Sequence, residues 1–83
     1  MRNFKSLEDF YTSREWEKFR QQIILERLND KGETIDEHTG KVIVNRNDII
    51  LHHIKPLTLG NVNDYTISFN PENIMIKIGR AHV

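Results

Sequence analysis

Residues 51–58 read LHHIKPLT and place two histidines side by side in a stretch that is otherwise typical of a β-strand. Neighbouring side chains of an extended chain point to opposite faces, so His52 and His53 are expected to serve two different purposes. The surrounding residues DIILHHI predict a strand that ends before Pro56, because proline has no backbone N–H for a neighbouring strand.

The chain is one small domain of 83 residues that contains no cysteine. A chain of this length buries only about 60% of its unfolded surface, and such domains often need a metal, disulfides or a partner. The absence of cysteine excludes disulfides and a thiolate zinc site. The remaining soft ligands are the histidines, His38, His52, His53 and His82.

Neither charge nor hydropathy identifies a partner. Twelve Lys and Arg balance twelve Asp and Glu, so the net charge is zero and the usual electrostatic argument for nucleic-acid binding is absent. No apolar run approaches the length that spans a membrane, and the N-terminus lacks the apolar core of a signal peptide. These features predict a soluble intracellular protein whose function must be argued from a site.

The strongest helix signal is TSREWEKFRQQIILERLND, residues 12–30. Thr12 followed by Glu15 fits a capping box, and Ser13 is an alternative cap. Apolar residues recur at helical spacing, namely Trp16, Phe19, Ile23, Ile24 and Leu28. Basic residues cover much of the remaining surface, namely Arg14, Lys18, Arg20 and Arg27. They form either a solvated face or a face that contacts phosphates.

Three strands are expected in the rest of the chain. A turn at Thr39–Gly40 leads into a short strand from Val42 to Val44, DIILHHI forms the second, and NIMIKI alternates polar and apolar residues as a third. Residues 58–73 are polar and are predicted to form a long loop, a kind of segment that is usually functional or disordered.

Hydrolysis of a phosphodiester near neutral pH requires an activated water and a group that stabilises negative charge on the phosphate. A divalent metal can stabilise that charge as a Lewis acid, and a neutral histidine can activate the water as a general base. Adjacent histidines on a strand offer both functions, with His52 as the ligand and His53 as the base. The alternative is that the two histidines are structural or simply exposed.

Four stretches between residues 10 and 76 together resemble the HNH endonuclease family, in particular its small phage-encoded members: FYTSREWEKFR, IDEHTGKVIV, HHIKPLT and NVNDYTISFNPENIMI. The resemblance implies an α+β fold, with an N-terminal helix and a ββα-metal (His-Me finger) core that holds one divalent ion, Mg, Mn, Zn or Ni. It also implies DNA as the partner, no membrane, action in the cytoplasm of a bacterial host, and a link to phage packaging machinery.

The resemblance assigns a role to each matching residue. His53 takes the general-base position, and His52 takes the preceding metal-ligand position. Asn73 matches the middle asparagine, whose amide ties the loop and helps to orient the base; the alternative is a plain turn cap after Asn70–Pro71. His82 matches the final histidine, which is a metal ligand.

The chain departs from the family pattern in two places. Many relatives carry four cysteines on a structural zinc, and the matching positions here are Asp36, Thr39, Ile78 and Ala81, with His38 as a surface residue between the first two. The family's last helix continues beyond the final histidine, whereas this sequence stops at residue 83. The last helix is therefore expected to be largely missing.

The last six residues, IGRAHV, also match one translated reading frame of a widely used short-read sequencing adapter. This match predicts that residues 78–83 are a non-native tail, in which case His82 matches the ligand position by accident. Besides a working endonuclease, two alternatives stay open: a catalytically dead module that binds nucleic acid, and a truncated fragment that does not fold stably.

Overall fold

The computed structural model describes residues 3–79 and has an α+β fold, as expected. The α-helices are α1 (Leu7–Tyr11), α2 (Arg14–Glu26) and α3 (Tyr65–Ser68). The strands are β1 (Thr34–Ile35), β2 (Val42–Ile43), β3 (Ile49–His53) and β4 (Ile74–Ile78), and short 3-10 turns span Arg46–Asp48 and Pro71–Asn73. No helix within residues 3–79 is long and apolar enough to cross a membrane.

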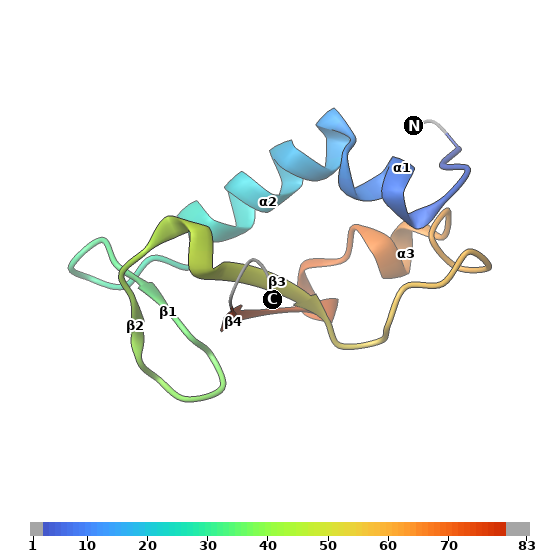
Figure 1. Cartoon of the computed structure of the whole chain (residues 1–83). Helices are drawn as coiled ribbons and strands as arrows, with labels where there is room; N and C mark the ends of the chain where they lie inside the picture. Colours follow the sequence, from blue (N-terminus) through green and yellow to red (C-terminus); the bar gives the residue numbers. More distant parts are fainter. Residues whose placement is uncertain (1–2, 80–83) are drawn as a thin grey trace.

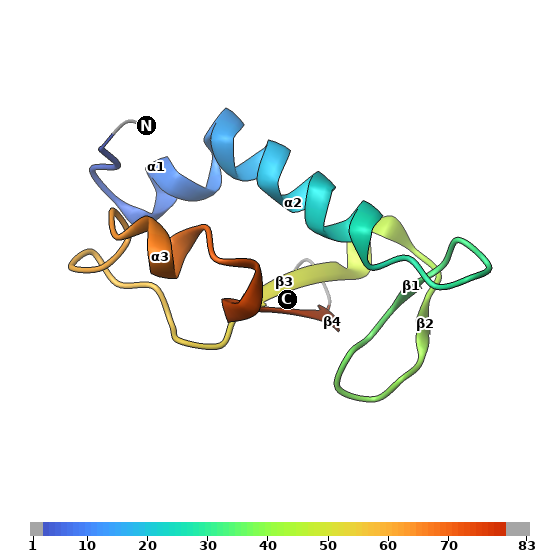
Figure 2. The same cartoon turned by 180° about the vertical axis from the view of Figure 1, so that it is seen from behind.

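The pair β3–β4 lies beneath α2, with α1 and α3 at one end of the molecule and the β1–β2 pair at the other (Figure 1). The view from behind shows the same arrangement (Figure 2). Both pairs are antiparallel, and β3 pairs with β4 although a long connection separates the two strands in the sequence. Tyr11, near the start of the chain, lies close to His53 at the end of β3.

Strand β4 confirms the third expected strand, and its register with β3 separates two faces. Leu51 lies opposite Ile76 and His53 opposite Ile74, and these four side chains are buried on the α2 side. His52 is exposed on the other face, next to its partner Met75. The β3 strand thus distributes its histidines between two environments.

Ser13 is the N-cap of α2, and its hydroxyl accepts a hydrogen bond from the backbone N–H of Trp16. The prediction of a capping box at Thr12 is therefore wrong. The Thr12 hydroxyl donates to the carbonyl of Glu8 instead, at the C-terminal end of α1. Helix α1 was not expected, and because Thr12 ends it, the N-cap of α2 is Ser13, one residue later than Thr12.

Two other local expectations need correction. The strand predicted from Val42 to Val44 ends at Ile43, and Val44 is almost fully exposed. Residues 58–73 are not a loop throughout, because they contain α3 and a 3-10 turn. Both begin with a side-chain cap: Asp64 accepts from the N–H of Thr66, and Asn70 accepts from the N–H of Glu72.

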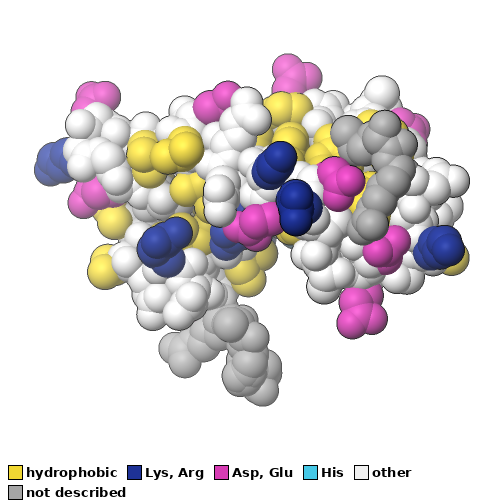
Figure 3. All heavy atoms as spheres, turned by 90° about the horizontal axis from the view of Figure 1, so that it is seen from above, with side chains coloured by type: hydrophobic (Ala, Val, Ile, Leu, Met, Phe, Trp, Pro, Cys, Tyr) yellow, Lys and Arg dark blue, Asp and Glu magenta, His cyan; other side chains and the backbone are white. Residues whose placement is uncertain are grey.

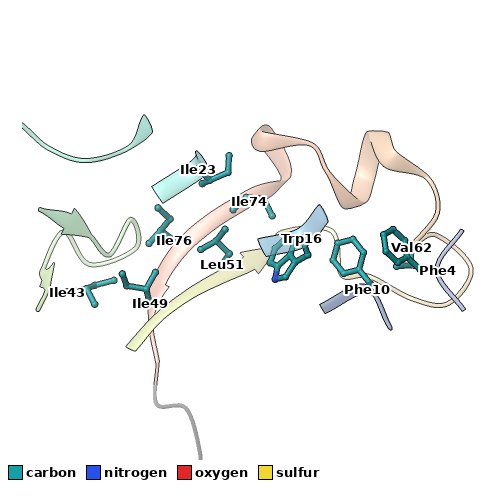
Figure 4. Close-up of a cluster of buried hydrophobic side chains, with 10 residues drawn as sticks. All are labelled: Phe4, Phe10, Trp16, Ile23, Ile43, Ile49, Leu51, Val62, Ile74 and Ile76. Atoms are coloured by element: carbon teal, nitrogen blue, oxygen red, sulfur yellow. The ribbon is translucent and has the colours of Figure 1, made fainter. Parts of the chain in front are cut away.

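The core is a row of buried side chains that runs between α2 and the β3–β4 pair and continues past both of their ends (Figure 4). Aliphatic residues fill one end, among them Ile23, Leu51 and Ile76, and Trp16 separates them from Phe10 at the other end. Trp16 and Phe10 have ring centroids 5.1 Å apart. The aromatic end of this core lies beside His53.

Asp36 fastens the turn after β1 to strand β4. Its Oδ1 accepts from the N–H groups of His38 and Thr39, and its Oδ2 accepts from the N–H of Ile78 at 2.8 Å. These backbone hydrogen bonds, that of Ile78 first, lower the pKa of Asp36 from 3.8 to about 2. The carboxylate of Asp36 thereby joins the turn at residues 36–39 to the end of β4. Ala81 lies outside the described residues.

Candidate active site

His53 is the last residue of β3 and is buried at the aromatic end of the core. Its ring stacks on Trp16 with centroids 5.3 Å apart and planes inclined by 30°. Phe10 and Tyr11 approach the ring edge-on, at 6.0 and 6.1 Å. Helix α1 and the first turn of α2 therefore enclose an imidazole that belongs to a strand 42 positions beyond Tyr11.

The hydrogen bonds of His53 determine which ring nitrogen carries the proton. Nε2 lies 3.0 Å from the carbonyl oxygen of Ser68, which can only accept, so Nε2 must be the donor. In the neutral ring Nδ1 then carries the lone pair, and the Tyr11 hydroxyl 3.3 Å away donates to it. This is the arrangement of a base whose orientation is set through its second nitrogen.

Burial removes water from the charged form of the imidazole and lowers the pKa of His53 below its ordinary value of 6.5. The bond to Ser68 acts in the opposite direction, and the nearby His52 lowers the pKa further. Burial also raises the pKa of Tyr11, which keeps its phenol protonated as a hydrogen-bond donor. At neutral pH, His53 is therefore an uncharged imidazole with a basic Nδ1.

His52 lies on the opposite, exposed face of β3, which it shares with the exposed Ile50. Among the described residues β3 pairs only with β4, which leaves the other edge of β3 without a neighbouring strand. The two imidazoles diverge from consecutive backbone positions close to this edge.

Asn73 connects the two ends of the segment between β3 and β4. Its Oδ1 accepts from the N–H of Lys55 at 2.7 Å, and its Nδ2 donates to the carbonyls of Lys55 and Ile67 at 3.3 and 3.0 Å. Its own carbonyl accepts from the N–H of Ile54. The cap of the 3-10 turn is Asn70, so the amide of Asn73 is used to close the loop and not to cap that turn.

The described residues supply one of the two expected metal ligands. His52 is accessible, whereas His82 lies outside the described residues. Within residues 3–79 no three His, Cys, Asp or Glu side chains converge as a metal would require. One exposed imidazole falls short of a complete ligand set, so a metal would need ligands from beyond residue 79 or from a bound phosphate.

The basic residues of α2 and of its C-cap, Arg27, have different environments. The guanidinium of Arg27 binds Glu37 and the carbonyls of Ile74 and Pro71, at 3.1, 2.8 and 2.6 Å. Arg20 donates to the carbonyl of Ile49. Basic and acidic side chains are interspersed over the face seen in Figure 3.

Arg27 is therefore a cross-link between α2 and the start of β4, and Arg20 ties α2 to β3. Of the four basic residues expected on one phosphate-contacting face, Arg14 and Lys18 are exposed. The interspersed charges give that face no strong preference for a polyanion.

Two residues that contact His53 were missed by sequence reasoning, Tyr11 and Ser68. Ser6, which caps α1 by accepting from the N–H of Asp9, could have indicated a helix before residue 12. No local signal places Tyr11 or the Ser68 carbonyl against the imidazole, because both contacts arise from tertiary packing.

No protein-family model, no curated protein and no solved structure matches the chain.

Proposed function

We propose that the chain is a DNA endonuclease of the HNH type, in which His53 is the general base. The observation that carries this proposal is the hydrogen bonding of His53: Nε2 is committed to the Ser68 carbonyl, and Nδ1 is left as a basic nitrogen. Burial lowers the pKa of this imidazole, which is compatible with a general base because a base needs an unprotonated ring at neutral pH.

The proposed reaction transfers a proton from water to Nδ1 of His53 while the water oxygen attacks phosphorus. The bond between phosphorus and the leaving oxygen breaks, and that oxygen takes a proton from solvent. The Ser68 carbonyl stabilises the imidazolium that forms, because Nε2–H donates to it more strongly when the ring is charged. Asn73 keeps the segment that contains Ser68 closed through its bonds to Lys55 and Ile67.

A divalent ion would be held by His52 together with His82 and oxygens of phosphate and water. When bound, it would act as a Lewis acid that stabilises charge on the phosphate and the leaving oxygen. The exposed position of His52 on the face opposite His53 is compatible with this division of roles. The ion is Mg²⁺, Mn²⁺, Zn²⁺ or Ni²⁺, since imidazole with oxygen ligands suits each of them.

The test is cleavage of supercoiled plasmid by the purified chain, with each of the four metals, beside His53→Ala, His52→Ala and the control His38→Ala. His38 lies in the exposed turn that Asp36 holds. Cleavage is expected from the unmutated chain and from His38→Ala, and a loss of at least about 100-fold is expected from His53→Ala. Equal cleavage by His53→Ala and His38→Ala would refute the assignment of the base.

Binding of a DNA duplex, measured by fluorescence anisotropy on the same proteins, distinguishes the enzyme from a binding module. The enzyme predicts that His53→Ala binds DNA as well as the unmutated chain does while it fails to cleave. A module without chemistry predicts binding in all four proteins and cleavage in none. His52→Ala is expected to raise the metal concentration needed for half-maximal cleavage, a change that His38→Ala should not produce.

A further inference from the structure

The hydroxyl of Tyr11 occupies the nitrogen of His53 that the proposed reaction needs. The neutral ring has one lone pair in its plane, on Nδ1, and the Tyr11 hydroxyl 3.3 Å away donates to it. A water molecule must donate its own proton to that lone pair in order to be activated. Tyrosine and water therefore compete for one acceptor.

Tyr11 is able to leave without opening the core. Tyr11 is 43% exposed, whereas the adjacent Phe10 is fully buried. Tyr11 also borders an open hollow of about 850 Å³ along the α1–α2 junction, whose lining includes Thr12 and Arg14. Rotation of the phenol toward this hollow would break one long hydrogen bond and the edge-on ring contacts that Tyr11 makes, and it would leave Phe10 and Trp16 in contact with each other.

We propose that Tyr11 is a gate on the base: its hydroxyl covers Nδ1 of His53 in the free protein and must be displaced before a water can be deprotonated there. This inference rests on the proposed function of His53. Tyr11 acts through His53 and is therefore a positioning residue. Its effect is regulatory, because the base is withheld until a substrate that reaches the α1–α2 junction moves the phenol.

The experiment compares Tyr11→Phe with Tyr65→Phe, which removes the same oxygen from the chain's other tyrosine. Phenylalanine retains the ring that packs against Phe10 and Trp16. The first measurement is acylation of His53 by diethyl pyrocarbonate, in which the lone pair of Nδ1 attacks the reagent; mass spectrometry of peptides follows the rate. The second is the turnover number for plasmid cleavage.

The gate predicts that Tyr11→Phe acylates His53 about 2- to 10-fold faster than the unmutated chain, the factor by which one neutral hydrogen bond shifts an equilibrium. His38 serves as the internal reference and should react at an unchanged rate, as should His53 in Tyr65→Phe. Turnover by Tyr11→Phe should rise by a similar factor, with little change in KM for DNA.

Two results would overturn the gate. An unchanged acylation rate at His53 in Tyr11→Phe would mean that the hydroxyl does not cover Nδ1. Faster acylation with slower cleavage would mean that Tyr11 assists the reaction and does not restrain it. Faster acylation in a protein that never cleaves DNA would support the gate over Nδ1 and refute the endonuclease instead.

Discussion

Among the side chains that contact the segment between β3 and β4, Asn73 is the one whose loss should destabilise that segment most. It makes three hydrogen bonds, to the backbone N–H and carbonyl of Lys55 and to the carbonyl of Ile67. One neutral hydrogen bond contributes about 0.5–1.5 kcal/mol, and two of these three are solvent-exposed. We therefore expect Asn73→Ala to lower the free energy of unfolding by about 1.5–3 kcal/mol.

That loss is a large share of the total, because a domain of this length has a free energy of unfolding of only about 4–12 kcal/mol. Urea unfolding followed by the fluorescence of Trp16, the chain's one tryptophan, measures it. Asn47→Ala, at an exposed position, is the matched control and should stay within about 0.5 kcal/mol of the unmutated chain.

Asn73→Asp sharpens the test because it retains the acceptor for Lys55 and places a carboxylate oxygen against two carbonyls. It should therefore destabilise the protein at least as much as Asn73→Ala at neutral pH. If Asn73→Ala and Asn47→Ala unfolded at the same urea concentration, the amide would not hold the loop. The proposed orientation of Ser68 by Asn73 would then be wrong as well.

Three further measurements follow from other contacts. Asp36, with its pKa lowered from 3.8 to about 2, stabilises the fold above pH 3.8, and this contribution disappears as the pH falls toward 2. The difference in urea midpoint between the unmutated chain and Asp36→Asn should therefore narrow across that interval; a constant difference would contradict the assignment. Arg27→Ala should lower the free energy of unfolding by about 2–4 kcal/mol, since it loses charge-assisted bonds to two backbone carbonyls, whereas Lys18→Ala should cost less than about 0.5 kcal/mol. Ser13→Ala should cost about 1 kcal/mol and reduce helical circular dichroism more than Thr12→Ala does; the reverse order would restore the capping box at Thr12.

The longest elements could be predicted because their signals are local. The spacing of Trp16 and Ile23 in α2 reflects the side of the helix that is buried against the strands. The alternation of β4 follows from its position between a core and an open face. In both cases one side of the element packs on the core and determines both the residue pattern and the burial pattern. The burial pattern can therefore be predicted from the sequence.

Helix α1 and strand β1 were not predicted, because a helix of five residues or a strand of two has no period to detect. Helix α1 is stabilised by the cap at Ser6 and by the burial of Phe10, which packs against Phe69 from the far end of the chain. Helices this short are marginal by themselves, so their existence depends on tertiary contacts. The β1–β2 pair likewise depends on Asp36 and its bond to Ile78.

The candidate site was predictable to the extent that it depends on the period of a strand. Alternation in β3 implies two faces, and it places His52 in solvent and His53 in the core. The expectation of a base that faces the attacking water did not include a cover over Nδ1. That cover is Tyr11, which reaches the imidazole only because α1 folds over the end of β3.

A buried general base has to satisfy two opposing requirements. Burial keeps the ring uncharged and fixed, but every buried lone pair needs a partner, because an unsatisfied buried acceptor costs about 1–3 kcal/mol. Among the described residues no buried side-chain nitrogen or oxygen lacks such a partner, and for Nδ1 of His53 the partner is Tyr11. A partner from the core could not be exchanged for water, whereas a half-exposed phenol beside an open hollow can be. The choice of Tyr11 as partner therefore leaves Nδ1 of His53 open to exchange with water, and replacing that one hydroxyl tests whether it covers the nitrogen.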